Sequence, residues 1–123
     1  MEKSRKPSEE LSSFLNFVDD CIREYHWACD VVMEEDRRLQ DLLHALEFSE
    51  DEAEKNRVAT KLRRSRRTRR SCKDLAKRDE LVVKFFENQE HQKTLNQLRQ
   101  LLGRQRKEES YLEGERTYTP RVQ

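Results

Sequence analysis

The apolar residues of the first 50 positions recur with the spacing of one long helix. One core position repeats every seven residues, and the second core position of the same heptads is apolar except at Glu35. These residues are Leu11, Val18, Tyr25, Val32, Leu39 and Leu46 at the first position, and Phe14, Cys21, Ala28 and Leu42 at the second. Neither glycine nor an internal proline interrupts the pattern, so it predicts a helix over residues 8–48. Pro7 and Ser8, followed by two glutamates, suit its start.

A second helix is expected over residues 50–87. Ser49 and Glu52 have the spacing of a capping box, with Ser49 as the N-cap, and the short connection predicts antiparallel packing on the first helix. The expected inward face is Val58, Leu62, Ser65, Arg69, Cys72, Ala76 and Val83. Its middle is small and polar, which predicts close packing with little apolar contact.

A third helix is expected over residues 89–113, starting at Asn88 or Gln89. Its apolar face is Leu95, Leu98, Leu101, Leu102 and Leu112. Pro120 and the β-branched residues near it predict an extended tail over residues 114–123. The pattern therefore predicts an all-α fold in one domain, residues 1–123: an elongated antiparallel three-helix bundle or coiled-coil hairpin with an extended C-terminal tail.

Charge is separated strongly along the chain. Residues 1–54 carry sixteen acids and six bases, whereas residues 55–78 carry twelve bases and one acid, Asp74. The remaining residues balance at eight of each, so the net charge of +1 hides a basic second helix beside an acidic first one. Clustered charge of this kind decides which partners a surface attracts.

The basic run is the main candidate binding surface. At ~100° per residue, most of its cations fall on one flank of the second helix, where they match the spacing of phosphates. The candidate residues are Arg63, Arg64, Arg66, Arg67, Arg70, Lys73 and Lys77. Three interpretations stay open: an exposed site for an anionic partner, internal pairing with the acidic first helix, or a solvated surface without a partner.

Acidic residues provide an alternative binding surface near the hairpin end of the first helix. These are Glu34, Glu35, Asp36 and Asp41, which could imitate nucleic acid or contact a protein. Arg69 points toward the core line, so it must extend to solvent or meet a carboxylate. Glu35 is the expected partner, and a buried Glu35–Arg69 pair would fix the helix register.

Other chemistry is weakly supported by the sequence. His26 and Cys29 lie three residues apart, but no further pair has zinc-ligand spacing, so neither a metal nor another cofactor is expected. Trp27 is either an exposed anchor for a partner or a cover for the third helix. No nucleophile stands beside a base and no glycine-rich phosphate loop is present, so we expect no enzyme and no small-molecule substrate.

The cellular setting is expected to be a reducing one. Cys21, Cys29 and Cys72 are odd in number and lie within helical patterns, which indicates free thiols. No secretory signal and no run of about 20 apolar residues is present, so we expect a cytoplasmic protein without a membrane partner.

From about Arg57 onward the chain resembles a group of short uncharacterised helical proteins encoded by phages and prophages of Gram-positive bacteria. The matching segments are Arg57–Leu62, Arg66–Arg67, Lys73–Asp74, Leu98–Arg99, Leu102–Gly103, Arg106–Lys107 and Glu115–Val122. The closing Arg-Thr-Tyr-Thr-Pro-Arg-Val stretch is the specific part, and the match covers roughly half of the chain. The resemblance implies a mobile-element origin, action in a host bacterial cell and a helical fold, without an assigned chemistry.

Two functional hypotheses follow. In the first, the arginine-rich helix of a phage accessory protein docks on nucleic acid or on a ribonucleoprotein. An inhibitor of a host defence complex, such as an anti-CRISPR protein acting on a CRISPR effector, is one form of it that rests on the resemblance. In the second, the protein is a helical adaptor that binds other proteins, or itself as a homo-oligomer, through its acidic heptad helix.

Overall fold

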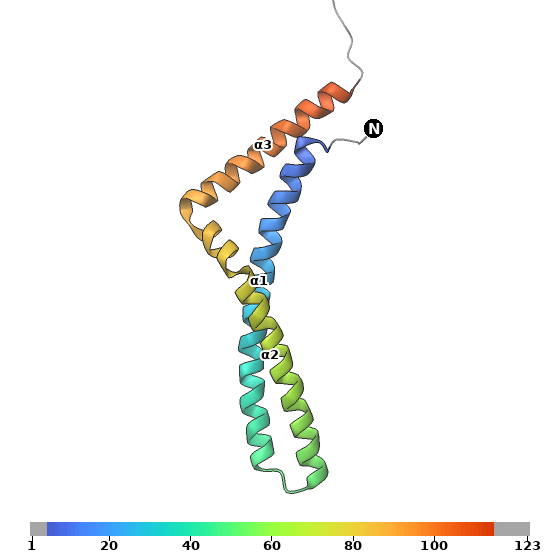
Figure 1. Cartoon of the computed structure of the whole chain (residues 1–123), viewed down its shortest axis with the longest axis vertical. Coiled ribbons are helices and arrows are strands. Elements are labelled where there is room, and N and C mark those ends of the chain that lie inside the picture. The colour runs from blue at the N-terminus through green and yellow to red at the C-terminus, as the bar shows by residue number, and fades with distance from the viewer. Residues whose placement is uncertain (1–4, 115–123) are drawn as a thin grey trace, which may run out of the picture. The chain divides into compact units, whose positions relative to one another are not determined.

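Three helices make up nearly all of residues 5–114, which are the residues that this computed structural model describes. They are α1 (Pro7–Glu47), α2 (Glu52–Glu87) and α3 (Gln89–Glu113), and the described residues include no strand (Figure 1). The predicted all-α class is confirmed, with the helices packed against one another. The expected tail lies outside the described residues apart from Gly114.

The chain divides into two compact units. We call residues 20–85 the hairpin unit, because they comprise most of α1 and nearly all of α2. The described residues up to Asp19 and from Phe86 onward form the terminal unit, which pairs the start of α1 with α3. Whether the chain behaves as the expected single domain stays a prediction.

The hairpin unit has a narrow core between two antiparallel helices (Figure 1). Asp36 of α1 contacts Arg69 of α2, whereas the earlier residue Glu24 contacts the later residue Arg78, so the two helices run in opposite directions. The buried apolar residues are Ala28, Val58, Leu62, Cys72 and Val83. They are mostly small, so the apolar area that stabilises this unit is limited.

Polar side chains interrupt this core along the line of contact between α1 and α2, which we call the seam. Ser65 belongs to the predicted small and polar middle of the inward face, whereas Asp79 was not among its predicted residues. Ser65 is 3% exposed, Asp79 is 4% exposed and Glu35 is 6% exposed. A buried polar group is costly unless it finds a hydrogen-bond partner. The packing of the two helices therefore depends on which groups these three side chains meet.

The connection between α1 and α2 differs from the predicted capping box. Ser49 Oγ donates to the Ala45 carbonyl at 2.6 Å, so this side chain terminates α1 instead of starting α2. Asp51 caps α2, because its side chain accepts from the Ala53 amide at 3.0 Å. The assignment of Ser49 as N-cap was wrong: a hydroxyl at a helix junction can satisfy either end, and here it meets an orphan carbonyl of the first helix.

The terminal unit buries Leu15 and Val18 of α1 with Leu95 and Leu102 of α3. Asn88 is the N-cap of α3, with its side chain accepting from the Glu90 amide at 2.9 Å, so the helix starts within the expected Asn88–Gln89 position. Two residues of the expected leucine face are exposed, however: Leu101 at 38% and Leu112 at 52%. One partner helix can cover only a narrow stripe of α3, so the leucines at the edges of the pattern stay in solvent.

A carboxylate of α3 caps the first turn of α1. Glu109 accepts hydrogen bonds from the Ser8 amide at 3.0 Å and from Ser8 Oγ at 2.5 Å. The first amides of a helix lack an internal partner, and the positive end of the helix dipole favours a negative group there. The Ser8 hydrogen bonds hold the pKa of Glu109 below its ordinary value of 4.5.

This contact predicts a pH-dependent contribution to stability. Because the pKa of Glu109 is lower in the folded chain, its stabilising effect is complete above pH 4.5 and disappears as the pH falls through the folded value. We expect a Glu109→Gln variant to melt below the wild type at pH 6, with a difference that shrinks toward pH 3. Thermal unfolding followed by circular dichroism across this range measures the difference. A difference that is constant with pH would contradict the assignment.

Candidate nucleic-acid interface

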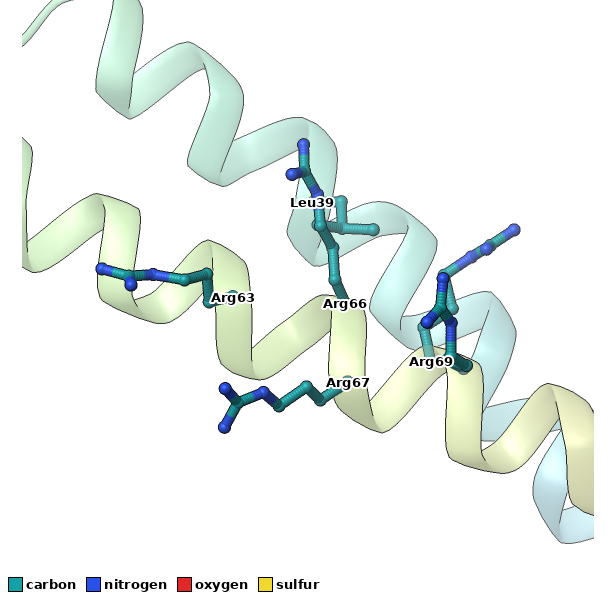
Figure 2. Close-up of a pocket in the computed structure, with 6 residues that line it drawn as sticks. Leu39, Arg63, Arg66, Arg67 and Arg69 are labelled. Atoms are coloured by element: carbon teal, nitrogen blue, oxygen red, sulfur yellow. The ribbon is translucent and has the colours of Figure 1, made fainter.

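Five arginines of α2 surround an open pocket beside α1. The pocket is lined by Leu39 of α1 and by Arg63, Arg66, Arg67, Arg69 and Arg70 of α2, with a volume of about 480 Å³ (Figure 2). Figure 2 shows Arg66 extending toward α1, past Leu39, while Arg67 extends away from α1. We call this the arginine pocket.

Most of the arginines that line the arginine pocket form no ion pair within the described residues. Arg69 Nε lies 2.5 Å from Asp36 Oδ1, whereas the other four arginines make no hydrogen bond or ion pair within the described part of the chain. The four are all exposed. The acidic residues of α1 therefore neutralise one of the five guanidinium groups that surround the pocket.

The predicted Glu35–Arg69 pair is wrong, because both residues have other partners. Glu35 accepts a hydrogen bond from Ser65 Oγ, and its carboxylate lies 3.3 Å from Arg38 of the same helix. Ser65 is short enough to let Glu35 reach it across the seam. Arg69 is long enough to extend past the buried seam to Asp36, nearer the solvent, where a charged group costs less.

A second pocket carries positive charge on another side of α2. It is lined by Leu42, Ser65 and Thr68 together with three cations, Arg38, Lys61 and Arg64, and its volume is about 470 Å³. Among these cations, Lys61 and Arg64 make no ion pair with any described residue. We call this the second basic pocket.

The seven predicted binding residues are all exposed, although they do not share one pocket. Arg63, Arg66, Arg67 and Arg70 line the arginine pocket, and Arg64 lines the second basic pocket. The other two, Lys73 and Lys77, lie further along α2, where Lys77 Nζ is 3.8 Å from Glu80. Sequence reasoning missed the contributions of Arg38 and Lys61, which become visible only when the two helices are paired.

The alternative acidic surface is smaller than expected. Glu34 and Asp41 are exposed, but Asp36 pairs with Arg69. Glu35 is buried and therefore does not belong to a surface. This correction follows from its heptad core position, which faces α2 and not the solvent.

Another polar cluster lies toward the opposite end of the hairpin unit. Arg78 contacts both Glu24 and Asp79, and the buried Asp79 Oδ2 has no hydrogen-bond partner among the described residues. Interaction with Asp79, followed by burial, raises the pKa of Glu24 above its ordinary value, while Arg78 acts in the opposite direction. Burial, reinforced by Asp79, raises the pKa of Cys21. The Cys21 thiol is therefore protonated at neutral pH and is a poor nucleophile.

Trp27 and His26 are both exposed. The rings of Tyr25 and His26 contact each other edge to face, with a distance of 5.6 Å between their centroids. Within residues 5–114, no three side chains of His, Cys, Asp or Glu are placed to hold a metal ion. In the same part of the chain, no helix is both long enough and apolar enough to cross a bilayer.

Comparisons with known proteins return no relatives: no protein-family model, curated protein or solved structure matches this chain.

Proposed function

We propose that this protein binds nucleic acid, either free or within a ribonucleoprotein, through the exposed cations of α2. The observation that supports this proposal is the set of exposed cations that make no ion pair with any described residue. Six of them, Arg63, Arg64, Arg66, Arg67, Arg70 and Lys73, lie close together along the helix. These cations occupy about three helical turns, a length of roughly 15 Å at 1.5 Å per residue.

Stability does not explain this arrangement. An exposed ion pair contributes only about 0–1 kcal/mol, and these cations do not form even such pairs. Like charges on adjacent turns repel one another and destabilise the folded chain. A polyanionic ligand would turn this repulsion into attraction, so the cluster is better explained by binding than by folding.

Binding would be mainly electrostatic. Guanidinium groups form bidentate hydrogen bonds with phosphate oxygens, and each contact releases condensed counterions from the nucleic acid. Contacts with phosphates position a protein on nucleic acid without reading its sequence. The protein in this proposal is a non-enzymatic binder, with α1 as the support that holds the arginines of α2 in place.

The biological setting remains part of the proposal. The resemblance to phage and prophage proteins favours an accessory role in a host bacterial cell. Inhibition of a host defence complex, as by an anti-CRISPR protein, is the form of that role in which the arginine pocket would meet a ribonucleoprotein.

A salt series tests the electrostatic mechanism. For a protein that neutralises about five phosphates of duplex DNA, the logarithm of the association constant should fall with the logarithm of salt concentration with a slope of about −4.5. Fluorescence anisotropy of a labelled oligonucleotide between 50 and 200 mM salt, a range over which such contacts weaken by orders of magnitude, measures this slope. Binding that does not depend on salt, or no binding at low salt, would sink the proposal.

A second candidate function is protein binding as a helical adaptor. Large apolar side chains of the hairpin unit are exposed, with Leu81 at 82%, Trp27 at 57% and Met33 at 56%. Such residues are typical anchors of protein interfaces when they cluster. If the adaptor binds other copies of itself, light scattering should give a molecular mass above that of the monomer at micromolar concentration and low salt. A monomeric mass under these conditions would count against self-association.

A further inference from the structure

The cations of α2 lie on two sides of the helix instead of forming one stripe. Arg66 and Arg70 line the arginine pocket, whereas Lys61 and Arg64 line the second basic pocket. Arg64 and Arg66 are two residues apart in sequence and so are separated by about 200° around the helix axis. Both sets lie beside the seam with α1, since Leu39 lines the first pocket and Leu42 lines the second.

Between these two sides, α2 presents an outer surface to solvent. Arg67 extends away from α1 (Figure 2), and Arg63 and Arg70, about one turn before and after it, are also exposed. These three residues are the outer edge of the arginine pocket. The buried face of α2, which includes Leu62 and Ser65, packs on α1. The helix is therefore held on one side and is basic on its two flanks and on its outer surface.

This distribution of charge matches a duplex better than a single strand. A single strand offers one line of phosphates, which one flank of a helix can follow. The major groove of B-form DNA has a phosphate backbone along each rim and is about 12 Å wide, close to the ~10–12 Å diameter of an α-helix with its side chains. A helix in this groove needs cations on both flanks.

Duplex RNA fits less well. The major groove of an A-form helix is deep and narrow, and side chains do not reach its base edges. The outer arginines, by contrast, are suited to the B-form groove, where arginine forms bidentate hydrogen bonds with guanine.

We propose that the ligand is a B-form DNA duplex and that α2 lies in its major groove. In this arrangement, Arg66 and Lys73, which lie seven residues apart on the same flank, contact phosphates of one rim, and Lys61 and Arg64 contact phosphates of the other. The outer arginines Arg63, Arg67 and Arg70 face the base edges. This inference rests on the proposed nucleic-acid binding and names the class of nucleic acid.

The first experiment compares three probes of one sequence: a DNA duplex, one of its single strands, and the corresponding RNA duplex. We expect the DNA duplex to bind at least about tenfold more tightly than either other probe at the same salt concentration, because only it can contact both flanks. A small ligand of the minor groove should leave this affinity unchanged. Equal or tighter binding of the single strand or of the RNA duplex would overturn the duplex inference while leaving nucleic-acid binding intact.

The second experiment separates the two flanks. The variants are Lys61→Gln with Arg64→Gln, and Arg66→Gln with Lys73→Gln, each of which removes two charges. Each variant should reduce the magnitude of the slope of log K against log salt concentration by about two. The two variants should also weaken duplex binding by similar factors. Lys93→Gln with Arg104→Gln in α3 removes the same charge from exposed residues of the terminal unit and is the matched control.

The outcomes distinguish the inference from the function on which it rests. If the Lys61 and Arg64 variant binds the duplex as the wild type does, one flank is sufficient and the groove arrangement is wrong. If the wild type binds none of the three probes, both the inference and the proposed function fail. Circular dichroism of each variant verifies that the helices are retained.

Discussion

Replacing Arg66, Arg67 and Arg70 together with glutamate is expected to weaken nucleic-acid binding by about 1000-fold at low salt. The three residues line the arginine pocket, and they form no ion pair with any described residue. The change removes three cationic contacts with the nucleic acid and places three carboxylates next to its phosphates, so attraction becomes repulsion. Fluorescence anisotropy with a labelled DNA duplex measures the loss of affinity.

The control for this experiment is a variant with the same change in net charge at a different place. Lys93, Arg104 and Lys107 of α3 are exposed and make no ion pair within residues 5–114, so their replacement with glutamate tests whether net charge alone matters. We expect this control to lose much less affinity, because screening weakens charges that do not touch the ligand. Equal losses in the two variants would contradict a localised site, as would full affinity in the arginine variant.

Changing Ser65 to leucine is expected to destabilise the hairpin unit by about 3 kcal/mol. Ser65 is 3% exposed and donates a hydrogen bond to the buried carboxylate of Glu35. Leucine removes this donor from a buried charged group, which costs about 1–3 kcal/mol or more, and overfills a close contact between helices, which costs about 1–3 kcal/mol. Urea unfolding followed by circular dichroism measures the change in the free energy of unfolding.

Two further variants separate these causes. Thr68→Leu introduces the same side chain at an exposed position one turn later on α2 and should change stability by less than about 0.5 kcal/mol. Glu35→Leu combined with Ser65→Ala replaces both polar partners with apolar groups, and we expect it to be close to neutral or stabilising. A Ser65→Leu variant as stable as the wild type would show that the seam is loose and that the Ser65–Glu35 contact contributes little.

Much of the fold follows directly from local patterns in the sequence. The heptads from Leu11 to Leu46 specify α1 because an apolar stripe of that spacing is buried only if the chain is helical. Asn88 marks the start of α3 because its side chain can satisfy an amide that the helix leaves free. The exposure of the candidate cations is also predictable from sequence, because an arginine outside the core positions of a helix hairpin has no buried place to occupy.

The sequence was less informative wherever one side chain had two partners within reach. Ser49 is next to the last turn of α1 and the first turn of α2, and the pattern of residues favours the wrong one. The exposure of Leu101 and Leu112 in α3 was also not predictable from the pattern. Periodicity shows which residues share one face of a helix, but it does not show how much of that face a neighbouring helix covers.

The sequence by itself determined three helices, their antiparallel order in the hairpin and a strongly basic α2. Only the tertiary structure decided which charges of α2 are neutralised. That outcome depends on the alignment of α1 with α2, where the short Ser65 receives Glu35 and the longer Arg69 reaches Asp36. The same alignment places Lys61 and Arg64 on one side of the seam and Arg66 and Arg70 on the other. Ion pairing acts over a few ångströms between residues far apart in sequence, so it is fixed by helix packing and not by the local pattern.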